Sequence, residues 1–164
     1  MQQAVDFLEE SESLHELVRH LKDEDFNRET SFKSWTLNEV FRHLHFWNYA
    51  ADKAREGDHA FLTFFEGPAG QLSSGTGLRE IEVDHLDGLS GCELLDTWRD
   101  FYLPMSERFA ETDPSRRLKW VGPDMSARSS ITARLMETWA HGQEVYDMLG
   151  VSRRNEDRIR NIVV

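Results

Sequence analysis

The sequence is poor in cysteine and in basic residues, and it has no long apolar run. A single cysteine, Cys92, excludes an internal disulfide and a cysteine-based metal cluster. The 19 basic residues against 30 acidic ones leave a net charge of −11, which disfavours nucleic acid and anionic membranes as main partners. No run approaches the roughly 18 apolar residues of a membrane span, and the first residues lack a signal-peptide pattern. We therefore expect a cytoplasmic protein that binds neither nucleic acid nor membrane.

Convincing strand patterns and glycine-rich phosphate loops are also missing, whereas four stretches have helical spacing of apolar residues. They cover about 2–22, 36–57, 90–113 and 126–149, within a length that suits one domain. Capping boxes begin the second helix (Thr36 with Glu39) and the third (Ser90 with Glu93), and Gly150 follows the fourth. Pro104 should kink the third helix.

The connection between the second and third helices is long. We expect a short helical piece at 58–66, a loop at 67–77 and an irregular or helical stretch at 78–87. The prediction is thus an all-α four-helix bundle over 1–150 with one long crossover connection, followed by a tail at 151–164.

Two histidines on the second helix differ in their expected environment. His43 lies on the flank of the apolar stripe that contains Val40 and Trp47, so it should face inward. His45 points the opposite way, with Asp52, and should face water. An inward histidine is either a hydrogen-bonded core residue or a ligand, and position alone leaves both interpretations open.

On the fourth helix, one side carries Ser130, Arg134, Glu137 and His141. Glu137 and His141 are separated by one helical turn, so the carboxylate and the imidazole lie on one face. Divalent metals accept this pair when a facing helix supplies a third ligand. The alternative is a solvated Glu–His pair with Arg134 as a salt-bridge neighbour, and the pattern alone does not decide between them.

Three segments resemble a known family. The residues 34–44, which contain Trp35-Thr36 and His43-Leu44, look like the Trp-Thr…His-Leu segment of DinB-like bundles. The segments 120–129 (WVGPDMSARS) and 133–145 (ARLMETWAHGQEV) resemble the N-terminal domain of the mycothiol-dependent maleylpyruvate isomerase group, in particular a metal-binding branch of actinobacterial type. The resemblance covers nearly the whole chain. Members of this branch usually continue into a further C-terminal segment, so 151–164 is expected to be its start or the end of a shortened member.

The resemblance implies a divalent metal, zinc or alternatively nickel, on His43, Glu137 and His141. It also implies a low-molecular-weight thiol such as mycothiol, whose sulfur would bind the metal and attack a small electrophilic substrate. The expected activity is a thiol-dependent transferase or isomerase. Arg134 could then hold an anionic group of thiol or substrate, and Ser130 could hydrogen-bond the bound cofactor, although both also have plain structural explanations. Glu144 could orient His141, and Trp120 could line the mouth of the site.

Two other function classes stay open on the sequence. One is a non-catalytic metal-binding or regulatory protein that uses the bundle for self-association, and the other is a structural bundle without metal. The flat faces of such helices also make a homodimer the expected oligomer.

Overall fold

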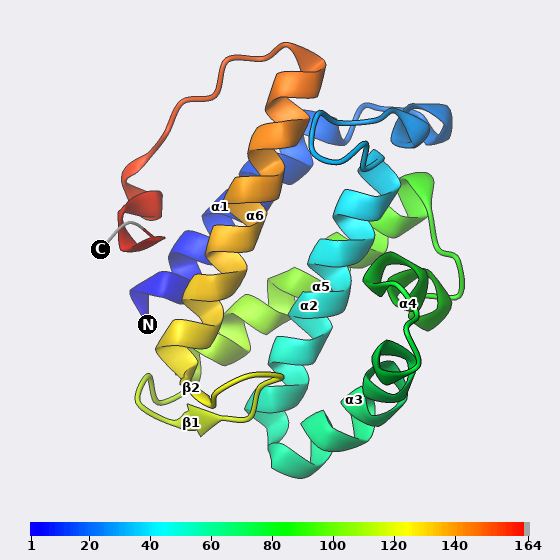
Figure 1. Cartoon of the computed structure of the whole chain (residues 1–164). Coiled ribbons are helices and arrows are strands. Elements are labelled where there is room, and N and C mark those ends of the chain that lie inside the picture. Colours follow the sequence, from blue (N-terminus) through cyan, green and yellow to red (C-terminus); the bar gives the residue numbers. More distant parts are fainter. Residues whose placement is uncertain (163–164) are drawn as a thin grey trace.

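The computed structural model describes residues 1–162 and is almost entirely helical (Figure 1). Four long helices form the predicted bundle: α1 (Gln2–Val18), α2 (Leu37–Glu56), α5 (Gly91–Glu111) and α6 (Ala127–Leu149). The crossover between α2 and α5 carries α3 (Asp58–Ser73) and α4 (Leu78–His85). The remaining elements are short: the 3-10 helices η1 (Asp23–Asn27) and η2 (Asp157–Ile162), and the antiparallel strands β1 (Arg117–Leu118) and β2 (Met125–Ser126). The all-α prediction is confirmed.

The core lies between the four long helices. The helix α1 packs against α5 and α6, and α2 packs against the same two helices from the other side. Its largest buried side chains are aromatic, among them Phe7, Phe41, Trp98 and Phe109, which are all fully buried. Burying such a side chain stabilises the fold by about 2–3 kcal/mol, so the periodic apolar faces determine which sides of the helices meet. Within the described residues, no helix is long and apolar enough to cross a bilayer.

The crossover is more helical than expected. The loop predicted at 67–77 is wrong for residues 67–73, because α3 continues through Gly67, Pro68 and Gly70 to Ser73, and it is right for residues 74–77, which connect α3 to α4. Phe61 and Pro68 are buried, and this tertiary packing outweighs the poor helix propensity of glycine and proline. The following stretch forms α4, which packs on α2 and α3. In Figure 1, α3 and α4 lie beside α2, on the side away from α1.

The capping prediction is right for α2 and wrong for α5. Glu39 donates its amide to Thr36 Oγ1, and the Glu39 carboxylate accepts the amide of Thr36 at 2.7 Å. By contrast, Ser90 makes no side-chain cap at the start of α5. The amide of Gly91 donates to Asn38 Oδ1, and that of Cys92 donates to Asp23 Oδ1, each at 2.8 Å. Side chains from distant parts of the chain therefore cap α5. At the end of α6, Gly150 adopts the predicted left-handed conformation.

His45 is buried, so the prediction that it faces water is wrong. Only 5% of the residue is exposed, and its ring packs edge-on against Phe101 of α5 with 5.3 Å between ring centres. Asp52, placed on the same outer side by the helical wheel, is also buried and pairs with Arg55 and Arg108. On this side of α2, Asp52 has charged partners, whereas His45 has an aromatic contact and its Nδ1 atom is buried without a hydrogen-bond partner among the described residues.

The segment after α6 runs back along the bundle. Arg153 and Arg158 both pair with the buried carboxylate of Glu10 on α1, and Asn161 donates to Asp6 at 2.8 Å. Figure 1 shows this segment, in red, returning beside α1 and close to the N-terminus. The last two residues of the predicted tail, 163–164, lie outside the described residues.

Candidate metal centre

Three side chains from two helices meet between α2 and α6. The Oε2 atom of Glu137 lies 3.4 Å from Nε2 of His43 and 3.3 Å from Nε2 of His141. One ligand atom from each residue lies within 4.8 Å of the others. Glu137 and His141 are one turn apart on α6, and the packing of α2 against α6 brings His43 to them. The structure therefore brings together the three residues that the sequence analysis selected as ligands.

The charges of the cluster suit a cation. Hydrogen bonds from His141 and then from His43 hold the pKa of the Glu137 carboxyl well below its usual range. Burial opposes protonation of His43, but hydrogen bonds with Glu137 and Glu82 outweigh it and raise the pKa of this histidine. An anionic oxygen thus lies between two imidazole nitrogens. Two nitrogens and one carboxylate oxygen form a donor set typical of zinc and of related divalent metals, so the residues present fit such an ion.

A second carboxylate contacts His43 at Nδ1, the ring nitrogen on the side away from Glu137, and the sequence did not indicate it. Glu82 lies on α4, is 1% exposed, and its Oε1 atom is 2.8 Å from Nδ1 of His43. The two residues are 39 positions apart, and no local pattern connects them. Only the docking of α4 on α2 reveals this contact.

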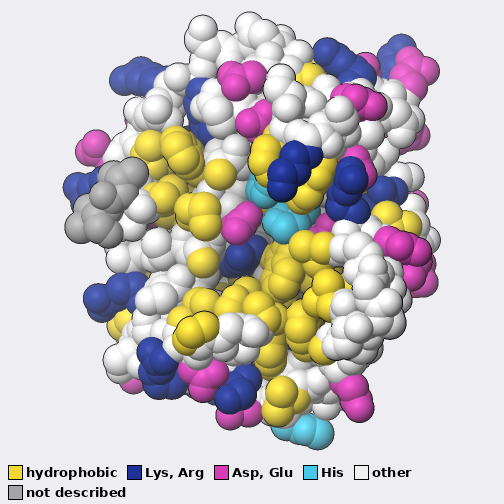
Figure 2. Space-filling view, in the orientation of Figure 1, with side chains coloured by type: hydrophobic (Ala, Val, Ile, Leu, Met, Phe, Trp, Pro, Cys, Tyr) yellow, Lys and Arg dark blue, Asp and Glu magenta, His cyan; other side chains and the backbone are white. Residues whose placement is uncertain are grey.

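Aromatic rings cover one side of the cluster. The ring of Trp35 stacks on that of His141 at an interplanar angle of 5° and 5.3 Å between centres, and it meets His43 edge-on at 5.2 Å. Phe32 also packs edge-on against His141. Trp35 therefore covers one side of both histidine rings and limits the access of water from that side. In Figure 2, histidine side chains reach the surface near the middle of the face, bordered by hydrophobic and charged side chains.

A cavity of about 210 Å³ lies next to the cluster. Its walls are polar at the metal-ligand side and largely apolar elsewhere, and they comprise His43, Trp47, Leu78, Trp120, Val121, Arg134 and Glu137. Trp120 lines this cavity, as the sequence analysis expected. Its ring packs against that of Trp47 at 5.5 Å between centres.

Arg134 is 5% exposed, so it is not the surface salt-bridge residue of the alternative interpretation. Its guanidinium carbon lies 5.8 Å from the ring centre of Trp120. Burial lowers the pKa of Arg134 to about 10, and the charge of Glu137 opposes this shift. The side chain therefore stays cationic at neutral pH. Within residues 1–162, its Nε and Nη1 atoms are buried without a hydrogen-bond partner.

Two weaker expectations concern other residues of α6. Ser130 is buried on the same helix and does not line the cavity in the described part of the chain. No hydrogen bond joins Glu144 to His141 among the described residues, where the stacked ring of Trp35 is what packs on His141.

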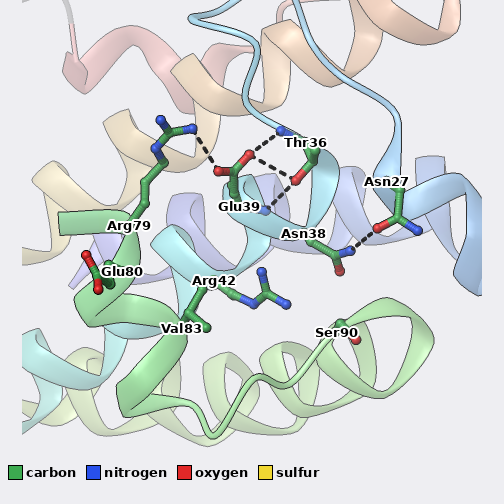
Figure 3. A pocket seen from close by; sticks show the side chains of 9 residues that line it. All are labelled: Asn27, Thr36, Asn38, Glu39, Arg42, Arg79, Glu80, Val83 and Ser90. Atoms are coloured by element: carbon green, nitrogen blue, oxygen red, sulfur yellow. Dashed lines mark hydrogen bonds and ion pairs between the residues drawn. The ribbon is translucent and has the colours of Figure 1, made fainter. Parts of the chain in front are cut away.

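A larger hollow of about 660 Å³ lies near the start of α2, between α4 and the residues before α5 (Figure 3). Its charged and polar groups bond one another. Glu39 accepts from Arg79 at 2.7 Å and also from Thr36, and Asn38 donates to Asn27 at 3.1 Å, as the dashed lines in Figure 3 show. Arg42 donates to the carbonyl oxygen of Leu89. Because these groups already have partners, this hollow is a weaker candidate than the smaller cavity beside Glu137.

The sequence of this chain matches one known protein family. Residues 7–146 match the family described as the mycothiol maleylpyruvate isomerase N-terminal domain. The chain belongs to this family. The matched region extends from α1 into α6 and contains His43, Glu137 and His141. The resemblance inferred from the sequence is confirmed, and the chain is a mycothiol-related, DinB-like helical domain.

Two curated relatives are uncharacterised proteins of Mycobacterium tuberculosis, from the strains H37Rv and CDC 1551. Each is 35% identical over 157 residues, which make up 96% of this chain and 60% of the relative. The chain therefore spans about 60% of the length of these relatives. No solved structure matches it significantly.

Proposed function

We propose that this chain binds one divalent metal ion through His43, Glu137 and His141 and acts as a thiol-dependent transferase or isomerase of the mycothiol type. One observation carries the proposal: two imidazole nitrogens and a carboxylate oxygen converge within 4.8 Å beside a cavity that contains a buried arginine. Membership of the mycothiol maleylpyruvate isomerase N-terminal family supports the thiol. Zinc suits the donor set best, and nickel is the second choice.

The ion, when bound by three side chains, offers an open position at which a thiol is held as thiolate. The chain's own residues prepare this position. Glu137 offsets part of the positive charge of the ion. Trp35 excludes water from the side of His141, so a ligand approaches through the cavity that Trp120 and Trp47 line.

The cavity determines what can enter. The cavity has a volume of about 210 Å³ and opens to solvent, so it can hold the reacting groups while the rest of a larger thiol extends outside it. The walls of Trp47 and Trp120 contact the apolar body of a small electrophile. The guanidinium of Arg134 holds an anionic group of thiol or substrate. Ser130, the weaker candidate for binding the cofactor, is buried on the same helix and does not line this cavity among the described residues.

The metal is tested first. Elemental analysis of protein purified without an affinity tag should find about one divalent ion per chain. His43→Ala, Glu137→Ala and His141→Ala should each lose most of it and remain folded by circular dichroism. Full occupancy in the Glu137→Ala variant would contradict the ligand set.

The thiol is tested on the cobalt-substituted protein. Mycothiol or a simpler thiol should produce a sulfur-to-cobalt charge-transfer band, and His141→Ala should abolish it. Arg134→Ala should weaken binding of thiol or substrate without changing metal content, because it removes the cation and leaves the ligands in place. If metal binds but no thiol at millimolar concentration perturbs the spectrum, the protein is instead a non-catalytic metal-binding or regulatory bundle.

The setting of the protein belongs to the same proposal. We place the metal-binding bundle at residues 1–150 in the cytoplasm, as a homodimer, with small molecules rather than nucleic acid or membrane as its ligands. The acidic charge supports the absence of nucleic acid and membrane as ligands, the single cysteine suits the cytoplasm, and the flat helical faces favour the dimer. Analytical ultracentrifugation tests the dimer, and a monomer at micromolar concentration would refute it.

A further inference from the structure

Glu82 differs in its partner from the three other deeply buried carboxylates of the described chain. Asp6 accepts hydrogen bonds from the neutral amides of Gln2 and Asn161. Glu10 and Asp52, which are 2% and 4% exposed, each pair with two arginines. Glu82 is buried more deeply still, yet among residues 1–162 it forms no ion pair with lysine or arginine. Its one bonding side chain is His43, through Oε1 and Nδ1 at 2.8 Å. A buried carboxylate is costly without positive charge nearby, so its own contribution to folding does not explain Glu82.

The surroundings of His43 indicate where that charge comes from. Its other ring nitrogen, Nε2, lies 3.4 Å from Glu137, so one imidazole separates two carboxylates. Arg134 is the cation that lines the adjoining cavity. His43 thus has a carboxylate at each ring nitrogen, and a divalent ion beside Nε2 would bring positive charge between the ring and Glu137.

We propose that Glu82 is a positioning residue of the metal centre: by accepting the Nδ1 proton of His43 it aims the Nε2 lone pair at the ion, and it couples metal binding to the docking of α4. The inference rests on the ligand set of the proposed function. It extends that function, because it makes the crossover helix part of the metal centre.

The positioning follows from the geometry. A hydrogen bond at Nδ1 fixes the rotation of the ring and the position of its proton, so that Nε2 faces Glu137 and His141. A carboxylate partner at this place also makes the imidazole a stronger ligand, and loss of such partners typically weakens metal affinity about 10–100-fold.

The coupling follows from the size of α4. A helix of eight residues is not stable alone, so its order depends on its docking. Its buried residues are Ile81 and Glu82, and its main neighbour is α2. If the ion strengthens the Glu82–His43 contact, the docking of α4 must strengthen ion binding by the same free energy.

The test uses the full chain with Co²⁺ or Zn²⁺ as the only ligand. The variant Glu82→Gln removes the charge and keeps the size, and Glu80→Gln removes the same charge from an exposed position of the same helix. We expect Glu82→Gln to weaken Co²⁺ affinity about 10–100-fold and to shift the d–d absorption of the bound ion. Glu80→Gln should change the affinity less than about twofold and leave the spectrum as in the wild type, since its side chain is away from His43.

Hydrogen exchange of the wild type tests the coupling without any substitution. The amides of α4 should exchange more slowly once Zn²⁺ is added, and Glu82→Gln should lose this protection. Equal Co²⁺ affinities of the Glu82→Gln and Glu80→Gln variants, or unchanged exchange in α4, would overturn the inference and leave the ligand set intact. A wild type that binds no ion overturns the inference and the metal proposal together. Affinity that depends on Glu82, in a protein that no thiol perturbs, supports the inference and refutes the thiol-dependent activity.

Discussion

The buried position of His45 predicts a specific acid sensitivity. Burial, and then the charge of His85, lower the pKa of His45 from 6.5 to about 4. Between these values the unfolded chain binds the proton and the folded protein does not. The free energy of unfolding is therefore unaffected by His45 above about pH 6.5 and falls progressively as the pH drops towards about 4.

The size of the effect follows from the two values. At about pH 5 the unfolded state gains about 2 kcal/mol from protonation of this residue, and at about pH 4 about 3 kcal/mol. The variant His45→Leu has no proton to bind and keeps an apolar contact with Phe101. We expect it to differ from the wild type by less than about 1.5 kcal/mol at about pH 8, because the two side chains have similar volumes. It should gain about 2 kcal/mol relative to the wild type by about pH 5.

Urea unfolding followed by circular dichroism measures this difference. Both proteins are unfolded in the presence of a chelator at several pH values between about 8 and 5, and the wild-type free energy is subtracted from that of the variant. The subtraction removes the titration of groups that behave alike in the two proteins. A difference that stays constant within about 0.5 kcal/mol over this range would refute the argument and return His45 to the solvent-facing position that the helical wheel predicts.

Three further predictions test other parts of the structure. Hydrogen bonds raise the pKa of His43 although burial opposes them, and protons compete with the metal for this histidine. Zinc affinity should therefore be steady in alkaline solution and fall as the pH drops through neutrality. Competition titrations in which the affinity stays constant down to about pH 5 would argue against histidine ligands. Asp23→Ala should destabilise the fold in urea unfolding more than Ser90→Ala does, because, of these two side chains, only that of Asp23 accepts an amide at the start of α5; a larger loss in Ser90→Ala would instead support the predicted capping box. Glu10→Ala leaves Arg153 buried without its counter-charge and should cost about 3 kcal/mol, and a loss below about 1 kcal/mol would show that the segment after α6 is only loosely attached.

The positions of the four long helices could be predicted from the sequence, because helical periodicity is a local property and each apolar face repeats many times. The pair Glu137 and His141 could be predicted for the same reason, since residues one turn apart share a face wherever the helix packs. His43 could be added because its flank of the apolar stripe faces the bundle. The resemblance to the mycothiol-related family supported this set independently.

Other features depended on contacts between distant residues, which local spacing does not encode. The helix α3 extends through Gly67 and Pro68 because it is packed on the bundle, not because of its propensity. The position of His45 opposite the apolar stripe of its helix indicated water, but α5 covers it. The capping of α5 by Asp23 joins residues 69 positions apart, and the contact of Glu82 with His43 joins residues 39 positions apart. The sequence by itself determined which residues could be ligands. The tertiary structure alone decided that Glu82 contacts one of them, His43, because the partner of a buried charge is set by the packing of whole helices.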